Sequence, residues 1–397
     1  MGSKVKFSNG TWEAPDNVTI GYIVGDGIGV DITPVTINVL NAAIDKAFNR
    51  NKKINWEEII IGEKALEKIG DILPEESLDK LKDLKIAIKG PLTTPVGRGF
   101  RSLNVTLRQK FDLYYAIRPI KYFEGVPSPM KNPKEIDMVI FRENTEDVYS
   151  GIEWPSGSKE AKEIIKYVKS TGKNIREDSG IGIKPISPYA TKRLIKEAID
   201  YAIKNKRKSL TIVHKGNIMK FTEGAFKEWG YEFLKENYGD KIIFEEDQKG
   251  ESDKIVVKNR IADSMFQQVL LRPKEYDVIA TTNLNGDYLS DALAAQVGGL
   301  GISPSANIGD GMAIFEATHG TAPKHAGKDE VNPTSLILSG VMMLELIGWK
   351  EAADLIVKSL KKTLINRTVT YDLHRQMDNA TLLKCSEFGK EIIKNMD

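Results

Sequence analysis

Two aspartates spaced four residues apart are the first side chains whose types and spacing suggest chemistry. Asp287 and Asp291 lie in residues 285–291, which we expect to open a helix that continues to Val297. Positions i and i+4 share one helix face, where two like charges repel by roughly 0.2–0.5 kcal/mol. A bound divalent cation would reverse that repulsion, Mg²⁺ or Mn²⁺ suits oxygen ligands, and Asp263 could supply a third carboxylate. The alternative is helix capping, because Asp287 is well placed as a cap and acids favour helix N-termini.

A cluster of arginines is the second candidate. The chain has 13 Arg and 44 Lys residues, and five of the arginines fall within residues 98–142: Arg98, Arg101, Arg108, Arg118 and Arg142. Arginine presents a planar fork that matches carboxylates, so several on neighbouring elements suit a substrate with two or three of them. The segment before Arg108 is a loop interrupted by Gly and Pro residues. It contains neutral hydrogen-bonding residues that could orient a polyanion, namely Thr93, Thr94, Ser102 and Asn104. The alternative is an ion-paired surface, which requires no ligand.

Two further residues follow predicted strands and could move protons. Tyr149 ends the run 141–149, which packs charged residues just after a strand, and its hydroxyl could donate a proton. Lys215 directly follows a strand that ends at His214, and it could serve as an active-site cation. Taken alone, these residues are better explained as a half-buried aromatic and a surface lysine.

Two other features of the sequence argue against a dinucleotide-binding fingerprint and against a zinc site. The glycine-rich residues 25–29 follow a strand, but the third glycine falls one position too early for the dinucleotide fingerprint. We interpret this segment as a tight strand-to-helix turn. Four histidines and one cysteine, with no His-Glu-x-x-His motif, do not assemble a convincing zinc site.

The elements that must position these residues alternate between strands and helices. We predict strands at 18–24, 85–88, 138–142, 210–214, 241–244 and 278–281, and helices at 32–48, 188–205, 224–237 and 262–271. This alternation is typical of an α/β fold with mostly parallel strand pairing. Residues 151–182 are charged, contain one amphipathic stretch at 159–168, and form an excursion from the main body. The chain is largely helical from Pro333 onward.

Composition restricts the remaining possibilities. The 397 residues, 41% of them hydrophobic, suffice for two or three domains. A net charge of +2 gives no electrostatic argument for nucleic acid or a membrane surface as the main partner. No apolar run approaches the ~20 residues that span a bilayer, and no secretory signal is evident. With a single cysteine, Cys385, we expect a cytoplasmic protein.

Read in order, these segments resemble the bacterial and archaeal NADP-dependent enzymes of the isocitrate and isopropylmalate dehydrogenase family. The resemblance runs from the first strand to Phe388 and rests on several long motifs. They span Gly25 to Gly29, Lys89 to Pro95, Arg101 to Asn104, Phe141 to Tyr149, His214 to Asn217, Asn283 to Asp291 and Glu316 to Lys324.

The resemblance implies an α/β fold that is not a Rossmann fold. A large domain would combine residues 1–113 and 298–397, and a small α/β domain would combine residues 114–146 and 188–297. Residues 147–187 resemble the clasp segment of the family, which locks two subunits into a homodimer.

The resemblance also implies an activity, the metal-assisted oxidative decarboxylation of isocitrate in the tricarboxylic acid cycle. The implied metal ligands are Asp287 and Asp291, with Asp263 of the partner subunit. Lys215 of the partner subunit would belong to the proton path, and Tyr149 would deliver a proton to the enolate. The implied substrate contacts are Arg108, Arg118 and Arg142, with Ser102 and Asn104 at the distal carboxylate.

The cofactor implied by the resemblance is NADP, whose 2′-phosphate requires cations and hydroxyls. The implied cofactor contacts are Thr94, His319, Gly320, Lys324, His325, Asn332, Tyr371 and Arg375. In the NADP-using relatives, the four positions that serve the phosphate hold Lys, Tyr, Tyr and Arg. His325 replaces one of those tyrosines, and a histidine can still donate a hydrogen bond or, when protonated, add positive charge.

Two alternative functions follow from the same residues. A 3-isopropylmalate or homoisocitrate dehydrogenase shares the fold, the metal and the chemistry. Isopropylmalate would call for an apolar residue near Ser102 and a Gly-rich segment at 144–149, and neither is seen. A non-catalytic regulatory subunit would predict the loss of Tyr149, Lys215 or a metal aspartate, and all of these are present.

Overall fold

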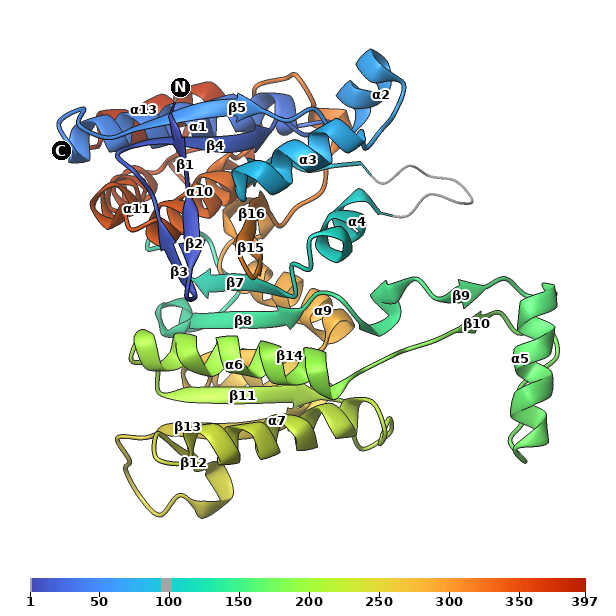
Figure 1. Ribbon diagram of the computed structural model, residues 1–397. Helices are drawn as coiled ribbons and strands as arrows, with labels where there is room; N and C mark the ends of the chain where they lie inside the picture. The colour runs from blue at the N-terminus through green and yellow to red at the C-terminus, as the bar shows by residue number, and fades with distance from the viewer. Residues whose placement is uncertain (1, 94–101) are drawn as a thin grey trace.

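One large sheet runs through the computed structural model, which describes residues 2–93 and 102–397 (Figure 1). Within the described residues this sheet has 12 strands. In spatial order they are β1 (Ser3–Lys4), β4 (Asn17–Ile23), β6 (Ile86–Lys89), β16 (Met312–Ala317), β15 (Pro304–Gly309), β7 (Tyr115–Lys121), β8 (Asp137–Glu143), β14 (Val278–Thr281), β11 (Ser209–His214), β13 (Ile255–Ile261) and β12 (Ile242–Phe244), with β5 (Lys53–Glu58) paired to β4.

Strand pairing is parallel toward both ends of the sheet and antiparallel in its middle. Strand β15 is antiparallel to both β16 and β7, and β7 is antiparallel to β8. The remaining pairs of this sheet are parallel. The predicted α/β class with mostly parallel pairing is therefore confirmed. The antiparallel centre also separates this fold from a Rossmann sheet, in which the strands run mostly parallel.

Helices cover the sheet in two groups (Figure 1). The upper group contains α1 (Gly29–Ala47), α2 (Glu63–Ile69), α3 (Glu75–Leu84), α10 (Thr334–Leu346), α11 (Lys350–Ile365) and α13 (Cys385–Lys394). The lower group contains α6 (Pro188–Lys204), α7 (Glu223–Tyr238), α8 (Ala262–Leu271) and α9 (Asn283–Gln296). Both ends of the chain lie in the upper group, where α1 packs against α10, α11 and α13. Fully buried Leu40, Trp349 and Phe388 belong to the core between these helices.

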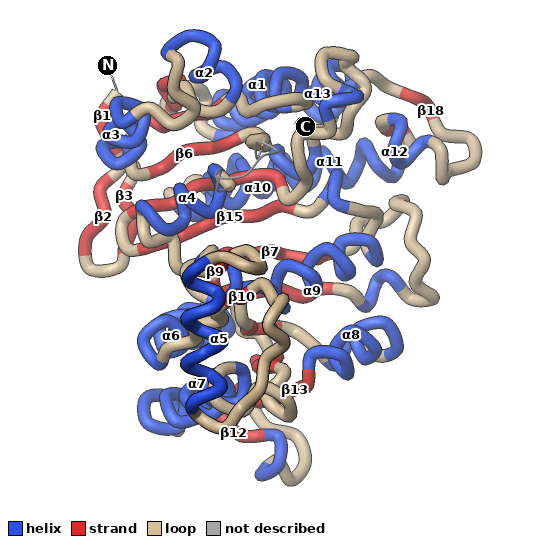
Figure 2. The backbone as a smooth tube through the Cα atoms, turned by 90° about the vertical axis from the view of Figure 1, so that its right-hand side faces the viewer, coloured by secondary structure: helices blue, strands red, loops and turns tan. Residues whose placement is uncertain are grey.

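A narrow extension leaves the body after β8. It consists of β9 (Glu153–Trp154), α5 (Lys159–Ser170) and β10 (Ile181–Gly182), with β9 and β10 antiparallel. Helix α5 stands off from the rest of the molecule in Figure 1 and crosses in front of α6 and α7 in Figure 2. It begins where the Ser158 hydroxyl accepts a hydrogen bond from the Ala161 N–H at 3.2 Å. The predicted excursion and its amphipathic stretch are confirmed.

The predicted strands and helices coincide with observed elements to within a few residues, but several strands were not predicted. The structure adds β5, β7, β13, β15 and β16, so only β8 of the antiparallel centre of the sheet was predicted. It also adds the short pairs β2 (Lys6–Ser8) with β3 (Thr11–Glu13) and β17 (Thr368–Val369) with β18 (Thr381–Leu382). Among the described helices, none is both long and apolar enough to cross a bilayer.

Candidate active site

A three-residue contact joins Tyr149, Arg142 and Asp287. Tyr149 lies in the 3-10 turn Asp147–Ser150 that follows β8, and its hydroxyl donates to Asp287 Oδ2 at 2.5 Å. Arg142, in β8, donates from Nη1 to Asp287 Oδ1 at 2.5 Å, and its guanidinium lies 4.8 Å from the Tyr149 ring. The structure therefore places a predicted proton donor, a predicted carboxylate clamp and a predicted metal ligand together.

Helix α9 positions the acidic pair. It begins at Asn283, so Asp287 lies inside the helix and the capping alternative is wrong. Asn283 and Asp287, spaced i, i+4, both accept hydrogen bonds from Arg142, whose Nε and Nη2 reach Asn283 Oδ1 at 3.0 and 2.7 Å. Asp291, one turn further, is half exposed and has an oxygen 3.8 Å from Nη1 of Arg118. Sequence reasoning missed Asn283, although its spacing from Asp287 placed it on the same helix face.

The two carboxylates on α9 have different electrostatic surroundings. Burial raises the pKa of Asp291, and Asp287 adds to this rise against the opposing effect of Arg118. Burial acts in the same direction on Asp287, but Arg142, Tyr149 and Arg118 outweigh it and lower the pKa of Asp287. Burial and the hydrogen bond to Asp287 raise the pKa of Tyr149, so its phenol is protonated at neutral pH. Two adjacent oxygen ligands whose repulsion is only partly relieved fit a hard divalent cation.

Three arginines form a buried basic wall beside these carboxylates. Arg108 in α4 (Leu103–Lys110), Arg118 in β7 and Arg142 in β8 are all buried. Arg118 donates to Ser290 Oγ at 2.5 Å, and Arg108 donates to Glu316 at 3.2 Å. The Nε atoms of Arg108 and Arg118 are buried and lack a hydrogen-bond partner among the described residues. Burial and mutual repulsion lower the pKa of Arg118 and bring that of Arg142 to about 9, so a bound anion would stabilise this wall.

Glu316, which sequence reasoning missed as a site residue, holds Arg108 in place. Its carboxylate accepts from Lys89 at 2.6 Å, from Arg108 at 3.2 Å and from Asn307 Nδ2 at 2.6 Å. Burial opposes ionisation, but Lys89 and Arg108 outweigh it and keep the pKa of Glu316 well below its ordinary value. The available signal was a single charged residue inside the apolar strand β16.

Ser102 and Asn104 lie at the N-terminus of α4, whose last turn carries Arg108. Ser102 is the N-cap residue, but its side chain makes no capping hydrogen bond. Oδ1 of Asn104 is buried and has no partner in the part of the chain that the structure describes. Helix N-termini favour anions, so this end of α4 suits a carboxylate. Thr94, Arg98 and Arg101 lie outside the described residues.

Lys215 and Asp263 pair with each other and do not join the carboxylates of α9. Lys215 directly follows β11, and Asp263 lies in the first turn of α8, where the bond to Lys215 lowers the pKa of Asp263. Within residues 2–93 and 102–397 of this one chain, no three acidic, histidine or cysteine side chains gather closely enough to hold a metal. One chain therefore offers two of the three predicted carboxylates at a single place.

The cofactor residues form a second cluster. The His325 ring stacks on Tyr371, with centroids 5.3 Å and planes 16° apart, and the Arg375 guanidinium lies 5.9 Å from the Tyr371 ring. His325 ends the 3-10 turn Pro323–His325, and Tyr371 opens α12 (Tyr371–His374). Lys324, in the same turn as His325, is exposed. Two separate segments thus present aromatic rings and cations together, as a phosphate-bearing cofactor would require. Nδ1 of His325 also lies 2.7 Å from the Glu330 carboxylate.

Three other predicted cofactor residues, His319, Gly320 and Asn332, lie in the described part of the chain. Burial lowers the pKa of His319, whose Nδ1 lies 3.0 Å from the Gly320 carbonyl oxygen. Asn332 is buried and donates to Asp372 Oδ2 at 3.0 Å, next to Tyr371.

The glycine-rich residues 25–29 pack against the loop that contains Thr321, between His319 and Lys324. The Ile28 N–H donates to the Thr321 carbonyl oxygen at 2.9 Å. Gly27 has a positive φ of 54°, and a Cβ there would lie 2.1 Å from that oxygen, so only glycine fits. The segment is a tight turn, as predicted, with a packing role.

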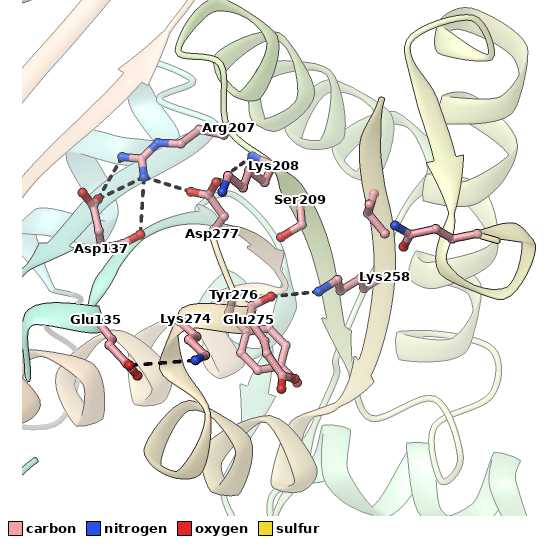
Figure 3. Close-up of a pocket in the computed structure, with 12 residues that line it drawn as sticks. Glu135, Asp137, Arg207, Lys208, Ser209, Lys258, Lys274, Glu275, Tyr276 and Asp277 are labelled. Atoms are coloured by element: carbon pink, nitrogen blue, oxygen red, sulfur yellow. Dashed lines mark hydrogen bonds and ion pairs between the residues drawn. The ribbon is translucent and has the colours of Figure 1, made fainter. Parts of the chain in front are cut away.

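A pocket at the opposite edge of the sheet has none of the predicted site residues among those that line it (Figure 3). Its lining includes Asp137 and Ser209, the first residues of β8 and β11, and Asp277, which directly precedes β14. The candidate site instead uses the last residues of these strands or those that follow them, such as Arg142 and Lys215. In open α/β sheets, ligands bind beyond the carboxyl ends of the strands, which favours the edge with the arginines.

An acidic pair, a buried wall of arginines and a separate cluster of aromatic rings and cations thus lie on one α/β fold, an arrangement typical of an enzyme that acts on anionic ligands. The chain belongs to the isocitrate/isopropylmalate dehydrogenase family, whose model matches residues 19–392. It is 54% identical to an NADP isocitrate dehydrogenase of Archaeoglobus fulgidus, over 100% of this chain and 97% of the relative. It is 58% identical to that of Pseudomonas aeruginosa, over 96% and 94% of the two chains.

A solved structure shows the same fold. The crystal structure of isocitrate dehydrogenase from Methylococcus capsulatus matches with a TM-score of 0.80 and 36% identity, over 95% of this chain and 99% of that one. The predicted family and fold class are confirmed.

Proposed function

We propose that this chain catalyses the oxidative decarboxylation of isocitrate to 2-oxoglutarate and CO₂ with reduction of NADP⁺, as an enzyme of the tricarboxylic acid cycle. Relatives that align over nearly its whole length carry the name NADP isocitrate dehydrogenase. The observation that carries the proposal is the buried basic wall, in which two arginine Nε atoms have no partner among the described residues. A substrate carboxylate is the natural acceptor for such donors.

Charge balance supports a tricarboxylate. The site sets four cations, Lys89 and the three arginines of the wall, against three carboxylates, those of Asp287, Asp291 and Glu316. A divalent cation would raise the excess to three positive charges, which equals the charge of fully ionised isocitrate. A monoanionic or dianionic substrate would leave buried positive charge uncompensated, and this is costly.

Each substrate contact has a proposed place. Arg108, Arg118 and Arg142 bind carboxylates through their guanidinium groups. Ser102 and Asn104, at the N-terminus of α4, bind the distal carboxylate that distinguishes isocitrate from isopropylmalate. The distal group of isopropylmalate is apolar, and it would leave these polar groups unpaired.

Two residues move the protons. In the reaction, the hydroxyl-bearing carbon of isocitrate gives a hydride to NADP⁺ while its hydroxyl gives up a proton, and a β-keto acid results. That acid loses CO₂, and the enolate left behind takes up a proton. Lys215 belongs to the path that removes the first proton. Tyr149, whose raised pKa keeps its hydroxyl protonated at neutral pH, supplies the second.

Asp287 and Asp291 would hold Mg²⁺ or Mn²⁺. The fit rests on two carboxylates one helical turn apart, with Asp291 half exposed and its pKa raised by burial and by Asp287. Bound there, the cation would polarise the substrate hydroxyl and stabilise the enolate charge. Asp263 of a second subunit would supply the third carboxylate.

We extend the proposal to a homodimer with shared active sites. The elements that carry Lys215, Asp263 and the α9 aspartates also expose large apolar side chains: Ile218, Phe221, Leu271 and Tyr288. Phe221 is 91% exposed in the single chain. Apolar groups gathered beside a site in this way mark a protein interface. Residues 147–187 would act as the clasp, with the large domain from 1–113 and 298–397 and the small domain from 114–146 and 188–297. We place the enzyme in the cytoplasm.

The cluster around Tyr371 would select NADP over NAD. Lys324, His325, Tyr371 and Arg375 would surround the 2′-phosphate, with Thr94, His319, Gly320 and Asn332 contacting the rest of the cofactor. The phosphate carries close to two negative charges at neutral pH, so the cations Lys324 and Arg375 are the principal contributors.

One assay tests the function. NADP⁺ reduction is followed with isocitrate and, separately, with isopropylmalate and homoisocitrate, each with and without Mg²⁺. We expect metal-dependent activity with isocitrate, and kcat/KM at least about a hundredfold lower with isopropylmalate, because the distal polar groups would then be unpaired. Higher kcat/KM with either alternative substrate would contradict the proposal.

A further inference from the structure

A fully buried carboxylate outside the basic wall lies at the junction of the site elements. Glu223 is the first residue of α7 and has 0% of its surface exposed. Its Oε2 accepts hydrogen bonds from the Lys215 backbone N–H and from Asn285 Nδ2, both at 2.8 Å. Its Oε1 accepts from Thr282 Oγ1 and from Lys184 Nζ, both at 2.9 Å. The Glu223 carboxylate therefore bonds to Lys215 after β11, to the start of α9, and to Lys184 at the base of the extension formed by β9, α5 and β10.

Lys184 connects Glu223 to a second buried carboxylate. It forms an ion pair with Asp147, which is also fully buried. Asp147 Oδ2 accepts from the Leu284 N–H at 3.0 Å, and its Oδ1 accepts from the Val148 N–H at 2.7 Å. Asp147 thus holds the turn that carries Tyr149 against α9.

We propose that Glu223 is a positioning residue that sets Lys215 and the α9 aspartates in register for the reaction. The inference rests on the proposed function. Ionised carboxylates are costly to bury unless their lone pairs are satisfied, and here each oxygen of Glu223 accepts two donors. An ordinary cap would bond to the N–H groups of its own helix. These bonds instead reach Lys215, the first turn of α9 and Lys184.

If the active sites are shared between subunits, one Glu223 has two roles. Lys215 would serve the active site of the partner subunit, whereas the α9 aspartates serve their own. One Glu223 would therefore influence both sites of the dimer. Replacing it should damage each by a different route.

The test compares Glu223→Gln with the matched control Glu228→Gln, which changes an exposed glutamate of the same helix. Glutamine keeps the shape but only one acceptor oxygen, so its amide hydrogens would face either the donors of Lys215 and Asn285 or those of Thr282 and Lys184. We expect kcat with isocitrate, NADP⁺ and Mg²⁺ to fall about 10–100-fold, the range typical of residues that orient catalytic ligands. The KM for isocitrate should change less than about threefold, since the substrate arginines keep their partners. The control should match the wild type.

Melting temperature and dimer mass are measured alongside the kinetics. A Glu223→Gln dimer that melts like the wild type and keeps its kcat would overturn the inference. A variant that lost kcat only in proportion to lost folded protein would do the same. If Glu223→Gln yields no folded dimer, Thr282→Val carries the test, because it removes one hydrogen bond to the same carboxylate and leaves the other three. It should lower kcat roughly threefold without changing the fold. An unchanged kcat would then overturn the inference.

Mixed dimers separate the two routes. Glu223→Gln subunits are refolded with Lys215→Met subunits and, separately, with Asp291→Asn subunits. We expect neither mixture to recover activity, because Glu223→Gln impairs the only site that each mixture leaves otherwise intact. Recovery in either would show that Glu223 sets only one of the two elements. An inactive wild type would instead reject the proposed function, and failure of Lys215→Met with Asp291→Asn to complement would reject site sharing.

Discussion

The two edges of the lower half of the sheet contain the same residue types and use them in opposite ways. At the amino ends of the strands, Arg207 donates to Asp137 at 3.0 Å and to Asp277 at 2.9 Å (Figure 3). Burial disfavours the charge of Arg207, but Asp137 and Asp277 outweigh it and raise its pKa. Near the carboxyl end of β8, burial and neighbouring arginines lower the pKa of Arg142, and the same causes lower that of Arg118 on the adjacent antiparallel strand β7.

The comparison separates charges that stabilise the fold, such as Arg207, from charges that suit a bound anion, such as Arg142. A raised arginine pKa means that folding favours the charged form, and a lowered pKa means that folding opposes it. The surroundings of Arg118 and Arg142 therefore favour a bound anion. Variants at the carboxyl edge should change activity with little loss of stability, and variants at the amino edge should do the reverse.

The largest effect is expected at Ser102. Ser102→Asp places a negative charge at the N-terminus of α4, where we propose the distal carboxylate binds, and like charges repel strongly in a desolvated site. We expect isocitrate oxidation to disappear while the far-UV spectrum and the melting temperature stay near those of the wild type. Ser102→Ala is the control, and it should retain measurable turnover. Near-normal kcat/KM in Ser102→Asp would remove this residue from the site.

The next effect concerns Lys215 and Asp291. Lys215→Met and Asp291→Asn should each lower kcat by about 10²–10⁴, the usual contribution of a proton-transfer or metal-binding group. When the two variants are unfolded and refolded together, mixed dimers contain one site with both defects and one with neither. Partial recovery of NADP⁺ reduction is expected. Confirmed mixed dimers without recovery would mean that each subunit builds its own site.

Variants of the cofactor cluster should change the choice of cofactor. Replacing Lys324 by Asp, with Tyr371→Phe and Arg375→Ala, should shift the ratio of kcat/KM from NADP toward NAD by several kcal/mol. This corresponds to two or three charge-assisted contacts at about 1.5–3 kcal/mol each. Both ratios are measured at saturating isocitrate and Mg²⁺. A wild-type ratio that already favours NAD would contradict the assignment of this cluster.

The smallest effect is expected at the amino edge. Arg207→Ala removes the ion pairs to Asp137 and Asp277, leaving Asp137 with Lys121 and Asp277 with the Lys208 N–H. It should lower the free energy of unfolding by about 1–3 kcal/mol, discounted for the partial exposure of these groups. Urea denaturation measures the loss, and kcat should change less than about twofold if the two edges are independent. A large fall in kcat would show that the edges are coupled.

The same variant has a defined pH dependence. Burial opposes ionisation of Asp137, but Lys121 and Arg207 outweigh it and lower its pKa. A lowered carboxylate pKa stabilises the fold above its ordinary value of 3.8, and this contribution is lost as the pH falls through the folded value. The difference in stability between the wild type and Arg207→Ala should therefore be full near pH 6 and shrink below pH ~4.

Features marked by a local sequence pattern were predicted more readily than features that depend on contacts between distant residues. Local patterns marked the pair Asp287 and Asp291, the arginines and the excursion, and in the structure the pair lies on α9, Arg108, Arg118 and Arg142 are buried, and the excursion is present. Strands β15 and β16 were missed because short runs that are buried throughout lack the alternation that marks a half-buried strand. Glu223 was missed because Thr282 and Asn285, to which it bonds, lie far away in sequence, and Glu316 was missed although it is the one charged residue of the apolar strand β16.

The packing of α1 against α10, α11 and α13 sets the order in which the chain can fold during synthesis. The covering helices of α1 are made only near the end of translation, roughly 20–70 s after α1 itself at ordinary elongation rates. Strands β8, β11, β13 and β14 are complete by residue 281 and can assemble while the remaining chain is still on the ribosome. Throughout this interval the apolar face of α1 is uncovered and can aggregate. We therefore expect nascent-chain chaperones to contact residues 29–47 for longer than any segment of the lower half.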